Sequence, residues 1–464
     1  MKFAADYGFC ASNDGLENAR ALQNAVLGGG EILIDKPGVY EIADQILLDD
    51  DTTLRFCEGA YLKRMENPEE NGYVFINRGA YTRTYNENIS IIGLRLICNG
   101  VIASPKTENS KKTILGLIGH CAFFYVKNLT IQDFECVDLP KYNYCIHICT
   151  FEDIVLENLH VEGMKDAVHL GRGKRFAIRH GIFRAFDDPI ALNGHDYITG
   201  NPELGWIEDG VIEDCIDLNA DSTTGYFCRI LAGAWTDWYE GMLVQRSDTV
   251  VSDGMMYRVL MPGDGKTYCS VTRPTHKTGE KEYDGIVWAA MQDDVTYTAG
   301  CRNIHFKDIR LQKTRPVAFS IHFDRNEWSR SYYPDAEIPV QENITLENIL
   351  VESEDLPVLI WSLSPVDRVC LKNCTLKNNF IRLGRLRAQG IVYPTMDLTL
   401  DGTRFESEIP LMVQCPPGRS VDLHVMNSKN KNFASEVMGE VQICESDIPL
   451  VNRPYEIPQI PPKK

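Results

Sequence analysis

Three aspartates within one short stretch have the residue types and the spacing that acid–base chemistry requires. Asp166 precedes the alternating run Ala167–Leu170, and Asp188, 22 residues later, precedes the similar run Pro189–Leu192. Asp187 directly precedes Asp188. If the runs are neighbouring strands, like charges face one another, which destabilises a sheet. Such a cluster suits general acid and base catalysis at a glycosidic bond, and its oxygens also suit calcium.

The elements that position these aspartates recur along the chain. The recurring phrase begins with Asn, Asp or Arg, alternates apolar and polar residues, and ends with Asn, Asp or Gly. Its clearest copies are Asn88–Gly93, Asn128–Asp133, Asp153–Asn158, Asn303–Asp308, Asn343–Asn348, Arg368–Asn373 and Asp397–Gly402. Many neighbouring copies are 22 to 29 residues apart. This pattern, with no helical periodicity between copies, predicts a parallel β-helix whose rungs stack about 4.8 Å apart. The closing polar residues suit left-handed turns and can form side-chain ladders.

In such a solenoid, Asp166 and Asp188 occupy the same column of adjacent rungs, with Asp187 beside them. Three carboxylates this close repel one another, so at least one should have a raised pKa and keep its proton near neutrality. His169 alternates away from Val168, and we expect it to be exposed.

The chain divides into four predicted segments. An amphipathic helix within residues 3–26 caps the first rungs, and rungs with the active site extend over 1–235. The period breaks, which places a small β module at 236–292 with a hairpin turn at Asp253-Gly254. Remaining rungs cover 293–440, and a proline-rich tail covers 441–464.

The module is rich in Trp and Tyr, which either form a miniature core or stack on sugars. It resembles small modules of chitinase-type carbohydrate-binding proteins and phage tail fibres, on the pattern from Asp248 to Trp288.

Composition limits the partners and the compartment. The net charge of −18 argues against nucleic acid and against an anionic membrane surface. The N-terminus has no apolar signal segment, which predicts a cytoplasmic protein, or a secreted or periplasmic one if a leader has been removed. The 15 cysteines are scattered without zinc spacing, and we interpret those at Cys136, Cys215, Cys370 and Cys374 as reduced thiols in the core. We expect neither a metal nor a cofactor, and oligomeric state stays open.

The opening residues and the aspartate stretch together resemble glycoside hydrolase family 28, the polygalacturonases and rhamnogalacturonases. That family carries N-T-D-G-[FIL]-D and, about 21 residues later, D-D-C-[IV]-A-[IL]-[NK]-[ST]-G. This chain has Met164–His169 and Asp187–Gly194 at those places. The resemblance implies a right-handed parallel β-helix that hydrolyses a poly- or oligosaccharide with inversion. Asp187 would be the general acid, while Asp166 and Asp188 would activate water across a gap of about 6.5 to 9.5 Å.

Two departures from that family concern the substrate. The family's next rung carries G-H-G, whereas Gly225–Gly233 has no histidine, and the family's R-x-K pair for the substrate carboxylate is missing. A neutral or differently charged sugar is therefore expected. The candidate substrate contacts are His195, Arg229, His322, Arg325 and Trp235.

Other functions fit the same residues. A polysaccharide lyase of this fold would need calcium or a basic residue to abstract a proton next to a uronate. A non-catalytic adhesin or tail-spike-like protein would use the module for binding. An epimerase or transferase is a fourth reading.

Overall fold

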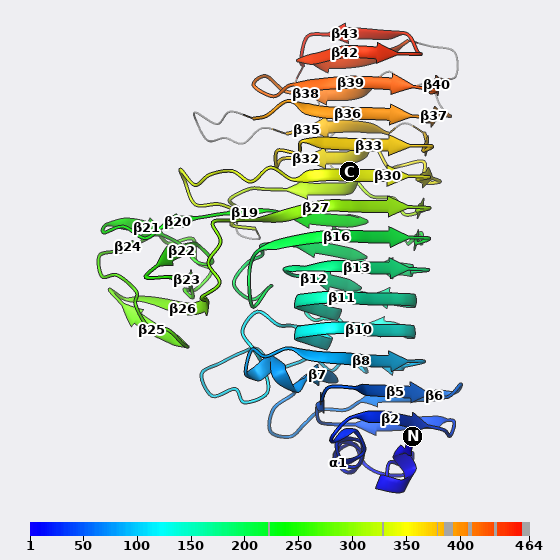
Figure 1. Cartoon of the computed structure of the whole chain (residues 1–464), viewed down its shortest axis with the longest axis vertical. Coiled ribbons are helices and arrows are strands. Elements are labelled where there is room, and N and C mark those ends of the chain that lie inside the picture. Colours follow the sequence, from blue (N-terminus) through cyan, green and yellow to red (C-terminus); the bar gives the residue numbers. More distant parts are fainter. Residues whose placement is uncertain are drawn as a thin grey trace.

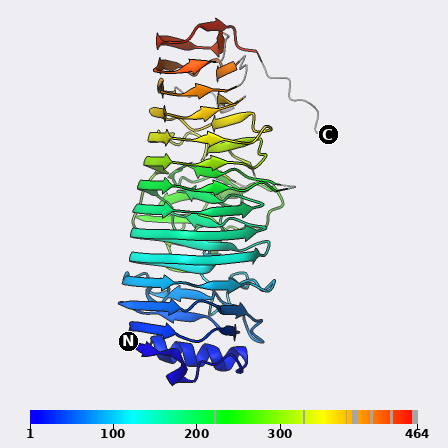
Figure 2. The same ribbon diagram turned by 90° about the vertical axis from the view of Figure 1, so that its right-hand side faces the viewer.

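The computed structural model describes residues 1–220, 223–326, 329–377, 379–384, 393–406, 411–430 and 434–456. The chain winds into a tall stack of rungs in which corresponding strands pair in parallel (Figures 1 and 2). It is a parallel β-helix, which confirms the predicted all-β solenoid.

Three ladders of strands form the stack. The first carries the repeated phrase and consists of β2 (Gly30–Ile34), β5 (Thr52–Phe56), β8 (Asn86–Ile92), β10 (Gly119–Leu139), β11 (Tyr144–Gly163), β13 (Gly173–Arg179), β16 (Trp206–Glu213), β27 (Thr298–Lys307), β30 (Glu342–Glu347), β33 (Arg368–Lys372), β36 (Met396–Asp401), β39 (Val421–Met426) and β42 (Val441–Ser446). The second consists of β3 (Gly38–Ile42), β6 (Ala60–Arg64), β9 (Arg95–Ile97), the later parts of β10 and β11, β14 (Ile182–Ala185), β17 (Ile216–Asp217), β28 (Arg310–Leu311), β31 (Leu350–Val351), β34 (Thr375–Leu376), β37 (Arg404–Phe405) and β40 (Lys429–Asn430).

The third ladder positions the aspartates. It consists of β4 (Ile46–Leu48), β7 (Phe75–Asn77), the first parts of β10 and β11, β12 (Val168–Leu170), β15 (Ile190–Asn193), β18 (Cys228–Leu231), β29 (Val317–His322), β32 (Val358–Ser362), β35 (Phe380–Leu383), β38 (Leu411–Cys415), β41 (Ser435–Gly439) and β43 (Leu450–Arg453). Because β42 and β43 pair with β39 and β41, residues 441–453 of the predicted tail form strands.

Apolar side chains at alternate positions fill the interior of the helix. Ile131, Leu156, Ile178 and Ile212 are fully buried and stack from rung to rung. Of the four cysteines interpreted as core thiols, Cys370 is only half-buried.

The polar residues that flank each phrase form the predicted ladders. Asn128 has a left-handed φ of 52° and donates its Nδ2 to Asn88 Oδ1 at 2.7 Å. Asn343, with a φ of 51°, donates in the same way to Asn303 Oδ1 at 3.2 Å. The side-chain amide thus links one turn to the next.

Helix α1 (Gly15–Val26) closes the N-terminal end, as predicted. Asp14 and Glu17 form a capping box at its start, and Leu22, Ala25 and Val26 are buried against the first rungs. Of the other short elements, β1 (Lys2–Phe3) pairs with β2, the 3-10 helix η1 (Ala4–Tyr7) contacts α1, and the 3-10 helix η2 (Arg78–Tyr81) contacts β10. No described helix combines the length and apolarity needed to cross a bilayer.

The insert stands beside the middle of the stack (Figure 1). It follows β19 (Gly233–Ala234) and contains β20 (Thr236–Asp237), β21 (Met242–Val244), β22 (Thr249–Ser252), β23 (Met255–Val259), β24 (Tyr268–Ser270), β25 (Glu280–Tyr283) and β26 (Ile286–Gln292). The predicted Asp253-Gly254 turn joins β22 to β23 with positive φ at both residues.

The aromatic residues of the insert settle the choice between core and stacking surface. Trp238, Tyr257 and Trp288 are 7%, 0% and 0% exposed and pack together. They form a miniature core, so the interpretation that the tryptophans here stack on sugars is wrong.

The turn ladder generates the first prediction. Asn128→Ala should lower the free energy of unfolding by about 1–2 kcal/mol. The substitution removes the side-chain hydrogen bond to Asn88, and it places alanine, which rarely adopts a positive φ, in a left-handed turn. Asn128→Gly should cost less, because glycine adopts this φ freely. Denaturant unfolding measures both, with the exposed helix variant Asn24→Ala as the control. Equal losses for Ala and Gly would show that backbone strain contributes nothing.

Candidate active site

The turns that lead from the second ladder into the third hold the three aspartates. Val168 pairs with Ile190 in register, so Asp166 and Asp188, each two residues earlier, occupy one column. The backbone N–H of Ala167 donates to the Asp188 carbonyl at 3.1 Å. The predicted column is confirmed.

The three carboxylates form a tight cluster of unequal depth. One oxygen from each lies within 4.8 Å of the others. Asp166 and Asp188 are buried at 3% and 2% exposure, whereas the Asp187 side chain is 26% exposed. The nearest oxygens are thus closer than the gap of about 6.5 to 9.5 Å expected between the acid and base of an inverting enzyme.

Lys165 compensates part of this charge and was not singled out from the sequence. Its ammonium pairs with Asp187 and lies 3.4 Å from Asp166 Oδ1. Burial acts to lower the pKa of Lys165, but Asp166 and Asp187 raise it above its usual value, so the group stays charged. The signal was present in the spacing, because Lys165 precedes Asp166 as Asp187 precedes Asp188.

Asp188 is the member of the cluster with the strongest reason to hold a proton. Burial, then Asp187 and Asp166, raise the pKa of Asp188 well above its ordinary value, and Arg229 opposes them. The direction of this shift agrees with the expectation that one member of the cluster has a raised pKa. The backbone N–H of Tyr226 donates to Asp188 Oδ1 at 2.7 Å and fixes the carboxyl group.

Gly225 makes room for both neighbouring carboxyl groups. Its φ is +67°, and a Cβ there would lie 2.4 Å from Asp188 Oδ1 and 2.8 Å from Asp187 Oδ1. A residue with a side chain would therefore displace the aspartates.

A buried ion pair holds the Asp187 turn from behind. Arg315 donates from Nε and Nη2 to the two carboxylate oxygens of Asp217 at 2.7 and 3.1 Å, and both side chains are fully buried. Its Nη1 donates to the carbonyls of Thr224 and Asp187 at 2.9 and 3.3 Å. One guanidinium thus ties together the two turns that carry Asp187 and Gly225.

His169 corrects the expectation of an exposed side chain. It does alternate away from the core, but it is 0% exposed and stacks on Tyr144 with a centroid separation of 3.9 Å. Its Nδ1 lies 3.0 Å from Asp166 Oδ2 and its Nε2 3.5 Å from Asp196 Oδ2. Burial lowers the pKa of His169 to about 3, so the ring is neutral.

Of the candidate substrate contacts, Arg229 lies at the cluster. It lies in the same column as His169 and Ala191, one rung further along the stack. Burial acts to lower its pKa, but Asp196 and Asp188 raise it. His322 lies farther along the ladder, with Nε2 3.0 Å from Asp324 Oδ2 and its ring 6.3 Å from that of Tyr226. Arg325 lies at the insert, with Nη2 3.7 Å from Asp248 Oδ2.

His195 and Trp235 are not placed to contact a sugar. They are 1% and 2% exposed, with ring centroids 5.9 Å apart, and the Trp235 indole donates to the Thr296 carbonyl. The insert covers both, so the structure corrects their expected contact with substrate to a packing role.

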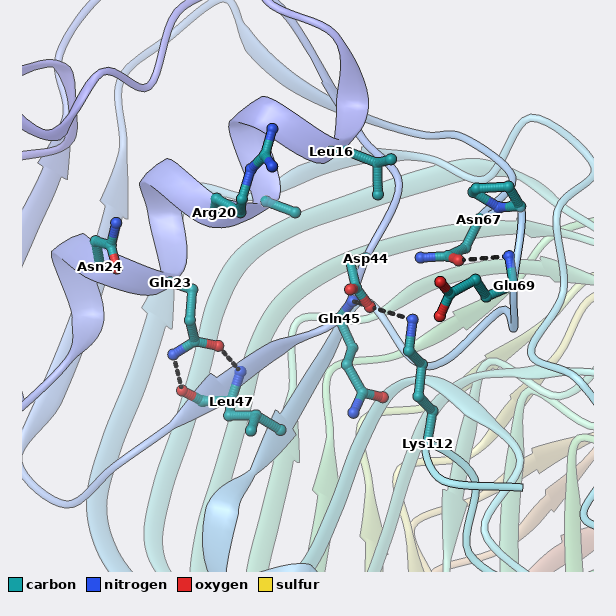
Figure 3. A pocket seen from close by; sticks show the side chains of 12 residues that line it. Leu16, Arg20, Gln23, Asn24, Asp44, Gln45, Leu47, Asn67, Glu69 and Lys112 are labelled. Carbon is teal, nitrogen blue, oxygen red and sulfur yellow. Dashed lines mark hydrogen bonds and ion pairs between the residues drawn. The ribbon is translucent and has the colours of Figure 1, made fainter. Parts of the chain in front are cut away.

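A cavity of about 600 Å³ lies elsewhere, between α1 and the first rungs (Figure 3). Its polar groups bind one another: Lys112 pairs with Asp44 at 2.8 Å, and the Gln23 amide exchanges hydrogen bonds with the Leu47 backbone. Size alone therefore does not identify the site.

The aspartate cluster has the oxygen ligands that calcium prefers. Lys165, however, contacts two of the three carboxylates, and the guanidinium of Arg229 places a second positive charge near Asp188. The cations of the chain itself thus balance the charge that a metal would.

Comparison with known proteins supports the fold. No family profile and no curated protein sequence matches this chain. A family 28 exopolygalacturonase from Yersinia enterocolitica superposes with a TM-score of 0.50 at 14% identity, over 92% of this chain and 78% of that one. The A-module of the mannuronan C-5 epimerase AlgE4 from Azotobacter vinelandii gives 0.49 at 11% identity, over 97% and 100% of the chains. The Streptococcus pneumoniae surface protein and adhesin PfbA gives 0.41 at 11% identity, over 94% and 99%. What this chain shares with the exopolygalacturonase at this identity is the parallel β-helix fold.

The raised pKa of Asp188 predicts a pH-dependent stability. When a carboxyl group has a higher pKa in the folded than in the unfolded protein, the folded protein loses stability as pH rises from the unfolded pKa toward the folded one. Asp188→Asn removes the ionisation and keeps an oxygen for the Tyr226 N–H. It should therefore raise Tm more at about pH 7.5 than at about pH 4.5. Thermal unfolding at both pH values tests this, and an equal effect at both would contradict a raised pKa.

Gly225→Ala should move the carboxyl groups of Asp187 and Asp188 and lower activity about tenfold or more, because misplacement of reacting groups by about 1 Å costs up to 10²-fold. Gly254→Ala is the matched control: it also has a left-handed φ, but no atom lies within 4 Å of its Cβ. Equal activity of the two variants would show that Gly225 does not shape the site.

Proposed function

We propose that this protein is a glycoside hydrolase that cleaves a poly- or oligosaccharide at the Asp166–Asp187–Asp188 cluster. The observation that carries the proposal is the clustering of the buried Asp188 carboxyl, whose pKa is raised by burial and by Asp187 and Asp166, with the partly exposed side chain of Asp187. A stored proton beside a group that can reach substrate is the arrangement that protonation of a leaving oxygen needs. The family 28 resemblance and the shared β-helix fold support the same reading.

The roles follow from depth in the site. Asp187 faces the substrate and protonates the glycosidic oxygen, drawing on the proton that the cluster shares. Transfer of this proton from Asp188 leaves two carboxylates, Asp166 and Asp188, to activate water. Lys165 stabilises the negative charge that returns to Asp187 after each turnover.

Direct attack by water gives inversion, as the resemblance implies. The close approach of the carboxyl groups also suits retention through a glycosyl–enzyme intermediate, whose two carboxyls are about 5–5.5 Å apart. The anomeric configuration of the first product, read by proton NMR, separates the two.

The lyase alternative needs a base, and Lys165 stays protonated beside its two aspartates. A lyase would release an unsaturated product that absorbs in the ultraviolet. A non-catalytic binding protein would cleave no member of a glycan panel.

Asp187→Asn should reduce kcat by about 10²–10⁴-fold while glycan affinity changes little, because the substitution removes proton transfer and leaves the shape of the site. Turnover and calorimetric binding of the glycan selected from the panel measure the two effects. Asp253→Asn is the control, since it removes an exposed carboxylate from a left-handed turn that asparagine also tolerates. Unchanged turnover in Asp187→Asn would refute the assignment.

A further inference from the structure

The junction between insert and solenoid contains a cavity of about 310 Å³ with a cationic lining. Arg246, Lys266, Arg325 and Arg330 line it, together with Tyr197, and no acidic residue of the described segments lines it. This concentration of positive charge occurs in a chain whose net charge is −18.

Asp248 balances only part of that charge. This buried carboxylate accepts from Arg330 Nε at 3.1 Å and lies 3.7 Å from Arg325 Nη2. The Gln245 backbone N–H also donates to it at 2.8 Å. One carboxylate thus faces two guanidinium groups, while Lys266 pairs with Asp264 at 2.9 Å.

Two guanidinium groups in the cavity have N–H donors that bind no described residue. Arg325 Nε is buried and has no hydrogen-bond partner within the described segments. Arg246 is exposed and forms no ion pair with any described residue. A planar guanidinium binds carboxylate or sulfate oxygens through two parallel hydrogen bonds.

Tyr197 connects the cavity to the aspartate cluster. It lines the cavity, and its side chain interacts with that of Tyr144, over whose ring centroid the Lys165 ammonium lies at 5.4 Å. Lys165 in turn contacts Asp166 and Asp187. Two largely buried tyrosines thus lie between the cavity and the residues that contact the aspartates.

We infer that this cavity is an anion subsite in which Arg246 and Arg325 bind a carboxylate or sulfate group of the glycan. The inference rests on the proposed function for the position of the glycan. Arg246 belongs to the insert, so the insert would help to bind the charged group of the substrate. The R-x-K pair that serves this purpose in family 28 is missing from the solenoid.

Binding to the Asp187→Asn protein tests the subsite without turnover. The probes are a galacturonate trisaccharide, its fully methyl-esterified form, and a sulfated galactose trisaccharide. We expect a charged probe to bind more tightly than the uncharged ester, and the Arg246→Gln/Arg325→Gln double variant to weaken that binding about tenfold or more while leaving the ester unaffected. The carboxylate and sulfate probes distinguish the two anions.

Lys277→Gln/Lys281→Gln is the control, because it removes two cations from the same insert away from the cavity. If the double variant unfolds, Arg246→Gln alone, at an exposed position, is measured in its place. Equal affinity for the galacturonate probe and its ester, no binding of either charged probe, or no effect of the cavity variants would overturn the inference. Cleavage by the wild-type protein is measured separately: loss of charge-selective binding with cleavage retained refutes only the subsite, and charge-selective binding without cleavage refutes only the hydrolase.

Discussion

Parallel, in-register stacking of the rungs is the constraint on which the site depends. Neighbouring strands lie about 4.8 Å apart, so residues at equivalent positions of successive rungs become contacts whatever their charge. The spacing of 22 residues places Asp166 next to Asp188 and Lys165 next to Asp187. The ladder therefore opposes two like charges in one column and pairs opposite charges in the adjacent one.

The rest of the site makes this arrangement tolerable. Lys165 and Arg229 supply positive charge, the Tyr226 N–H donates to Asp188, and Gly225 leaves space for the carboxyl groups. The buried Arg315–Asp217 pair fixes the turn that carries Asp187. Removing one partner of a buried ion pair leaves the other as an uncompensated buried charge, which commonly costs several kcal/mol of stability. The aspartates are thus held together by the side chains and backbone groups that surround them.

Much of this could be predicted because the β-helix is a repeating object. A phrase ending in Asn or Asp identifies the left-handed turns, and a constant spacing identifies which residues stack. The column of Asp166 and Asp188 followed directly from that logic, and the ion pair of Lys165 with Asp187 follows from it as well.

Features that depend on loops between the ladders could not be obtained in the same way. The alternation that turns His169 outward was correct, but residues 194–205 lie over that face and bury it, as the contacts of His169 with Asp196 and of His147 with Asn201 show. Docking of the insert buries His195 and Trp235 and brings Arg325 beside Asp248. These contacts join segments whose separation in sequence does not follow the repeat of the rungs, so the repeat cannot predict them.

The proposed glycosidic cleavage requires that Asp188 retain a proton among the stacked aspartates. The most direct measurement is carbon NMR of protein enriched at the aspartate carboxyl carbon, from about pH 4 to about pH 8. The Asp188 resonance is assigned by its loss in Asp188→Asn. We expect Asp188 to keep the chemical shift of a protonated carboxyl group after the exposed aspartates of the chain have ionised. Titration of Asp188 together with those exposed residues would contradict it.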